Sequence, residues 1–157
     1  MAVLLLACGL LAGACSTSTS STDKFVGTWT FDSGTITPTN CQGLGPISLV
    51  GETLTLAKGT GSDLVSTLQS SFGTCTLNLT VSGNVADANA GQSCMFNVPV
   101  GGTTLTFTFN ITSWSVTTTD GVAMTTNATA AGTGLAAACS IALTGAATKH
   151  AADGSAG

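Results

Sequence analysis

The chain has 157 residues, which suits one domain, and only 6% of them are charged, with a net charge of −4. All three basic residues are lysines, so the sequence lacks the basic patch that nucleic-acid phosphates require and the arginine forks of a phosphate or carboxylate clamp. Threonine, serine, asparagine and glycine supply the polar character instead, which indicates a β-rich domain with an uncharged surface and no nucleic-acid partner.

The first predicted element is an apolar segment over residues 1–14, which has the length of the hydrophobic region of a signal peptide. It ends in Ala12-Gly13-Ala14 before Cys15, and a run of serine and threonine follows. This pattern resembles the lipobox of bacterial lipoproteins, in which small residues precede the cysteine that becomes the lipidated N-terminus. The resemblance implies a signal peptide over residues 1–14, a lipid on Cys15 and a flexible tether over residues 15–23.

The same resemblance predicts where the protein is located. Ser16, not aspartate, follows the cysteine, which in lipoproteins favours the outer membrane. We therefore expect a lipid-anchored protein of the bacterial outer membrane, periplasmic or surface-exposed, with the membrane as its partner through the lipid. The charged N-terminal region of a signal peptide is missing, so we expect the natural start upstream of Met1 or a trimmed chain. A signal peptide without lipidation, or a buried strand or helix over residues 1–14, are the alternatives.

The cysteines predict two disulfide bonds. Six cysteines reduce to four once Cys8 is assigned to the signal peptide and Cys15 to the anchor. An even number in an oxidising compartment is typical of a disulfide framework, and the absence of C-x-x-C spacing argues against zinc or thioredoxin-type chemistry. Three connectivities of these four cysteines are possible. The order of the predicted strands favours Cys41–Cys75 together with Cys94–Cys139.

Residues 24–147 are predicted to form eight or nine short strands joined mostly by short turns. Apolar and polar residues alternate along them, and no stretch shows helical periodicity. Asp32-Ser33-Gly34 predicts a turn after the first strand, and Thr119-Asp120-Gly121 predicts a hairpin turn. The alternation breaks at Trp114, which predicts a bulge near Ser113. The fold class is therefore all-β, as an antiparallel up-and-down barrel of eight or nine strands or, alternatively, a β-sandwich.

The first strand carries a second resemblance. Gly27-x-Trp29, entered by Phe25 after the tether, is similar to the opening strand of lipocalin-like (calycin) barrels, where this motif marks the closed floor of the barrel. The family tends to carry an arginine near the last strand that packs over the tryptophan. This chain has no arginine, and Lys149 is the cation near that point.

Few side chains are suited to catalysis. The single histidine, His150, lies in the segment 148–157, which we expect to be a flexible tail. Asp32, Asp63 and Asp120 occur in turn patterns, where aspartate serves the backbone. Glu52 shares strand parity with the leucines that follow it, so it either faces a site or lies solvated at the barrel mouth. No metal-ligating cluster occurs at useful spacing, and we expect a protein that is not an enzyme and needs no cofactor.

The inner face of the predicted barrel is the remaining candidate site. We expect it either to hold a small hydrophobic ligand or to pack into a solid core, in which case the protein would act as a structural or surface-interaction lipoprotein; an eight-strand barrel permits both. Protein partners are not predicted. The inward-facing residues are Phe25, Trp29, Phe31, Leu54, Leu56, Leu77, Leu79, Phe96, Phe107, Phe109 and Ile141.

Overall fold

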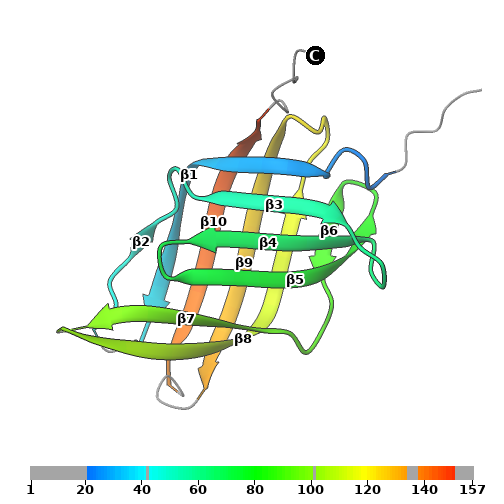
Figure 1. The fold of residues 1–157 in the computed structure, drawn as a ribbon. Helices are drawn as coiled ribbons and strands as arrows, with labels where there is room; N and C mark the ends of the chain where they lie inside the picture. Colours follow the sequence, from blue (N-terminus) through cyan, green and yellow to red (C-terminus); the bar gives the residue numbers. More distant parts are fainter. Residues whose placement is uncertain (1–20, 42, 101, 134–137, 151–157) are drawn as a thin grey trace, which may run out of the picture.

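The computed structural model describes residues 21–41, 43–100, 102–133 and 138–150, which form ten β-strands (Figure 1). The predicted signal peptide and Cys15 lie outside these residues. The alternation of apolar and polar residues explains the strands, since every second side chain of β9, for example, is buried. The strands are β1 (Gly27–Thr39), β2 (Ile47–Ser48), β3 (Thr53–Lys58), β4 (Leu64–Ser70), β5 (Gly73–Ser82), β6 (Val85–Ala88), β7 (Ser93–Val100), β8 (Thr103–Thr117), β9 (Ala123–Thr133) and β10 (Ser140–Lys149).

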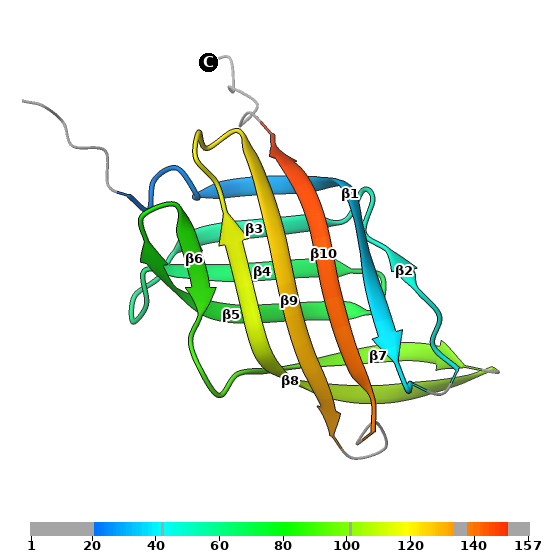
Figure 2. The same cartoon turned by 180° about the vertical axis from the view of Figure 1, so that it is seen from behind.

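Eight of these strands close into an antiparallel barrel in the order β1-β3-β4-β5-β6-β8-β9-β10, and β10 pairs with β1 to complete it. The short strand β2 pairs with β1, and β7 pairs with β8. Figures 1 and 2 show β3, β4 and β5 on one side of the barrel and β8, β9 and β10 crossing them steeply on the other. The predicted antiparallel barrel is confirmed, and its closure excludes the sandwich.

Two long strands serve both sides of the barrel because each bends partway along. β1 pairs with β3 through Gly27–Thr30 and with β10 through Trp29–Thr39. β8 pairs with β7 in its first half and with β9 in its second, and its register with β9 shifts between Ile111 and Ser113. This shift is the bulge that the break in alternation predicts, and bulges of this kind bend and twist a strand.

The turn predicted at Asp32-Ser33-Gly34 is wrong. These residues belong to the continuous strand β1, whose register with β10 shifts between Phe31 and Ser33. Aspartate, serine and glycine suit a turn, but they also suit the irregular backbone of a bulge. Gly34 is needed there, because its φ is +147° and a Cβ would lie 2.7 Å from the carbonyl oxygen of Thr144.

The end of the barrel where the described chain begins and ends is closed by Trp29. The indole is fully buried, and its N–H donates to the carbonyl oxygen of Phe25 at 2.8 Å. The ammonium of Lys149 lies 4.9 Å from the ring centroid and donates to the carbonyl oxygen of Lys24 at 2.9 Å. Lys149 therefore packs its ammonium group against the buried ring at this end, and β10 extends past the expected boundary at residue 147.

Two disulfides are present, but the predicted pairing is wrong. Cys41 is joined to Cys139, with Cα atoms 4.5 Å apart, and Cys75 is joined to Cys94, with Cα atoms 5.2 Å apart. The predicted pairing considered only the end of the barrel at which each cysteine lies, and not which strands lie side by side around the barrel. Cys41 follows β1 and Cys139 precedes β10, so the closing ladder β1–β10 places them side by side.

Candidate functional site

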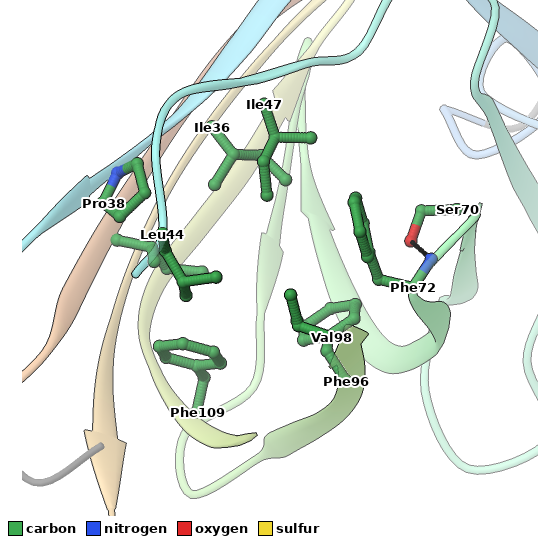
Figure 3. A pocket seen from close by; sticks show the side chains of 10 residues that line it. Ile36, Pro38, Leu44, Ile47, Ser70, Phe72, Phe96, Val98 and Phe109 are labelled. Atoms are coloured by element: carbon green, nitrogen blue, oxygen red, sulfur yellow. Dashed lines mark hydrogen bonds between the residues drawn. The ribbon is translucent and has the colours of Figure 1, made fainter. Parts of the chain in front are cut away.

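The end of the barrel opposite Trp29 carries an apolar hollow of about 40 Å³, partly open to solvent (Figure 3). Side chains reach it from the far half of β1, from the segment that leads into β2, from the β4–β5 turn, from the β7–β8 hairpin and from the start of β10. Most of the large apolar side chains around it are only half-buried, which is unusual for a monomeric surface. The lining residues are Ile36, Pro38, Leu44, Ile47, Ser70, Phe72, Phe96, Val98, Phe109 and Ile141.

The wall of this hollow offers no free polar group. Ser70 is the one lining residue with a polar side chain, and its hydroxyl donates to the carbonyl oxygen of Gly73 at 3.1 Å and accepts from the N–H of Phe72 at 3.3 Å. The rings of Phe96 and Phe109 lie tilted to each other with centroids 6.2 Å apart. The hollow therefore suits an apolar group and supplies nothing to orient a polar one.

A second apolar cavity, of about 20 Å³, lies deeper in the barrel. Buried side chains of Leu68, Trp114 and Leu143 line it. Ile36, Phe96 and Ile141 line both this cavity and the outer hollow, so the two spaces lie next to each other.

The barrel wall beside these cavities is closed partly by side chains. β6 pairs with β5 only as far as Leu79, and below that point β7 faces β5 without a continuous ladder. The side-chain amide of Gln92 satisfies the backbone of β5 there, where no strand pairs with it. The amide oxygen accepts from the N–H of Asn78 at 2.7 Å, and the amide nitrogen donates to the Asn78 carbonyl oxygen at 2.9 Å. Cys75–Cys94 and the N–H of Asn97, which donates to the Phe72 carbonyl oxygen at 2.8 Å, hold β7 in place.

Three buried polar atoms inside the barrel lack a partner in the described part of the chain. They are the hydroxyl oxygens of Ser66 and Thr126 and the indole nitrogen of Trp114. A buried polar group without a hydrogen bond costs about 1–3 kcal/mol. Natural structures usually explain such groups by bound water or by function.

The residues predicted to face the barrel interior divide into two groups. Phe25, Trp29, Phe31, Leu54 and Leu56 belong to the main core cluster, together with Leu77 and Leu79, and they line neither cavity. Phe96, Phe109 and Ile141 line the hollow, whereas Phe107 packs beside Phe109 in a smaller cluster near the β7–β8 hairpin.

Several lining residues were not predicted from the sequence. Leu44 and Phe72 lie in a loop and a turn, where strand periodicity gives no indication of direction. The signal that was available is their composition, since large apolar residues are unusual in such positions. The others are Ile36, Pro38, Ile47, Ser70 and Val98.

The ionisable side chains do not gather at the hollow. His150 is exposed near the Trp29 end, and its backbone N–H donates to the carbonyl oxygen of Thr28 at 3.0 Å. Glu52 is half-buried, and the Asp63 carboxylate accepts from the N–H of Val81 at 2.7 Å. Within residues 21–41, 43–100, 102–133 and 138–150, no group of three or more His, Cys, Asp or Glu side chains could hold a metal ion.

A larger depression, of about 340 Å³, lies on the side formed by β8, β9, β10 and β1. Threonines and alanines such as Thr117, Thr125, Ala146 and Thr148 line it, with Asp32 at one side. It is shallow and open, so a ligand there would keep much of its surface in water, whereas ligand sites usually bury most of the ligand. We therefore regard the apolar hollow as the better candidate site.

No family of known proteins matches this chain, and neither a curated protein nor a solved structure matches it. Among the described residues, no helix is long and apolar enough to cross a membrane.

Proposed function

We propose that this protein is a non-enzymatic binding module of the bacterial envelope, with a lipocalin-like barrel that takes a small hydrophobic ligand at its open end. The observation that carries the proposal is the lining of the hollow. Ile36, Leu44, Ile47, Phe72 and Phe96 keep part of their apolar surface in water, although full burial of such a side chain stabilises by about 1.5–3 kcal/mol. A concave apolar patch of this kind marks a site that a ligand or partner covers.

The proposed lipid anchor agrees with this use of the barrel. The described chain enters the barrel at the Trp29 end, and the hollow lies at the opposite end, near the β7–β8 hairpin (Figure 1). A lipid on Cys15 would therefore hold the Trp29 end towards the membrane and leave the hollow open to solvent. Replacement of Cys15 by serine should release the protein from the membrane fraction, and sedimentation with membranes would contradict the anchor.

The second candidate function is that of a structural or surface-interaction lipoprotein with a solid core. The cavity sizes favour it, because 40 and 20 Å³ are far below the several hundred cubic ångströms of most ligand pockets. Its contacts would be made through the threonine-rich exterior. Thr28, Thr55, Thr67 and Thr76, for instance, are register partners in one row across β1, β3, β4 and β5.

A fluorescence titration separates the two candidates. The test protein is the chain from Ser16 onward, which contains all ten strands, both disulfides and the segment that closes the Trp29 end. We expect 1-anilinonaphthalene-8-sulfonate to bind it with one site, and Ile47→Asp to weaken binding at least tenfold because it places a charge in the apolar wall.

The matched control is Val122→Asp, which changes an exposed valine between β8 and β9, at a position that lines neither the hollow nor the inner cavity. It should leave binding unchanged. No saturable binding, or equal weakening by both variants, would favour the solid-core candidate. Circular dichroism of each variant shows whether the barrel is intact.

A further inference from the structure

The outer face of β1, β3, β4 and β5 carries threonines in two parallel rows. Each of these strands presents two outward residues on either side of a buried one, and the residues meet in register across all four strands. Seven of the eight positions are threonine, and we call the set the threonine array. One row is Thr28, Thr55, Thr67 and Thr76, and the other is Thr30, Thr53, Gln69 and Thr74.

The threonine array is regular and rigid. Neighbouring strands of a sheet lie about 4.8 Å apart, and alternate residues along a strand lie about 6.8 Å apart. Figure 1 looks onto this face and shows the four stretches nearly parallel, so the face is close to flat. Threonine is β-branched and therefore restricted in its χ1 torsion. The residues between the two rows are all buried, which fixes the backbone beneath the array; they are Trp29, Leu54, Leu68 and Cys75.

The hydroxyl groups of the array are available to water. Within the part of the chain that the structure describes, none of them makes a hydrogen bond to another residue. Thr28, Thr74 and Thr76 are exposed, and the other threonines of the array are partly exposed. None of the eight positions carries a charge. The array therefore presents methyl and hydroxyl groups at fixed repeats in two directions, without an ionic group.

A protein or a polysaccharide would fit the threonine array poorly. The buried centre of a protein interface is enriched in aromatic residues, methionine and arginine. Sugar rings, for their part, commonly stack on aromatic side chains. Among the described residues, the exposed large apolar side chains are Val50, Met95 and Val122, and none of them belongs to the array. An uncharged, regular lattice of hydrogen-bonding oxygens is the surface that matches an uncharged, regular lattice of hydroxyls.

We propose that the threonine array binds the surface of ice. In the prism faces of hexagonal ice, the water oxygens repeat in two directions at spacings similar to those of the array. Each threonine contributes little, because its hydrogen bond to ice replaces one to liquid water. Eight positions held on one rigid face act together, and their side chains lose little further freedom on binding. The proposal does not depend on the apolar hollow, since no residue of the array lines it.

Ice-affinity partitioning of the chain from Ser16 onward tests this proposal. A slowly growing ice crystal excludes ordinary solutes, so the wild type should be enriched in the ice relative to serum albumin in the same solution. Thr67→Lys should lower this enrichment about tenfold, because it places a strongly hydrated charge at the centre of the array. The matched control is Thr144→Lys, which changes an exposed threonine of β10 outside the array and should partition like the wild type.

Gln69→Thr provides a test that does not depend on damage to the face. It completes the second row, so thermal hysteresis, the gap between the melting and freezing temperatures, should rise about twofold at equal protein concentration. Circular dichroism shows whether each variant keeps the barrel.

Three results would each overturn the proposal. They are a wild type that stays in the liquid with albumin, equal loss of enrichment in both lysine variants, and a Gln69→Thr variant without increased thermal hysteresis. None of them bears on the apolar hollow, whose binding the fluorescence titration measures separately.

Discussion

The two disulfides should contribute unequally to stability, because they close loops of different length. Cys41–Cys139 spans 98 residues and Cys75–Cys94 spans 19. When a cross-link acts by restricting the unfolded chain, its contribution grows with the logarithm of the loop length. That relation gives about 4.7 kcal/mol for the long loop and about 3.2 kcal/mol for the short one.

Urea unfolding of two double variants measures the difference. Cys41→Ala with Cys139→Ala should lower the unfolding midpoint about 1.5 times as much as Cys75→Ala with Cys94→Ala, since the same slope applies to both. The second pair is more deeply buried, so each variant is also compared with the wild type after both proteins have been fully reduced, which isolates the packing cost of the substitution. Equal shifts, or a larger shift for the short loop, would refute the argument from loop length.

Three further outcomes are expected. Thr126→Val should raise the free energy of unfolding by about 1 kcal/mol, because it removes a buried hydroxyl that has no partner among the described residues. If chemical denaturation shows a lower free energy of unfolding instead, a bound water satisfies this hydroxyl in the wild type. Lys149→Met should cost about 1–2 kcal/mol by thermal unfolding, because it removes the cation above the indole ring while keeping the stem, and an unchanged midpoint would contradict that contact. Hydrogen bonds from the backbone N–H groups of Val122 and Ala123 hold the pKa of Asp120 below its usual value of 3.8. The wild type should therefore be more stable than Asp120→Asn above that pH and should lose this advantage as the pH falls through the lowered pKa. A difference in stability that does not depend on pH would refute this expectation.

The barrel can be predicted because the sequence pattern that identifies each strand lies within that strand. Alternation identifies the strands, and the break at Trp114 identifies the bend in β8 because side-chain parity is lost there. The irregularity at Asp32 was predicted as a turn, since the same residue types serve both a turn and a bulge. The sequence does not distinguish a chain that reverses from one that only bends.

The disulfide pairing and the hollow were harder to predict because both depend on the closed three-dimensional arrangement. Cys41 and Cys139 meet only because the last strand pairs with the first. Leu44 and Phe72 reach the hollow from a loop and a turn, where neither the two-residue period of a strand nor the period of a helix predicts the direction of a side chain. Ligand sites are often built by such connecting segments on a rigid scaffold, so strand periodicity alone assigns too much of the site to the barrel interior.

We propose that the hollow at the open end of the barrel binds an apolar molecule. Native mass spectrometry of the protein isolated from its own envelope tests this most directly, since it needs no assumption about the ligand. We expect an added mass that organic extraction recovers as an apolar compound. Ile47→Asp should abolish this added mass, and Val122→Asp should retain it. A mass equal to that of the lipidated chain alone, in wild type and both variants, would contradict the claim.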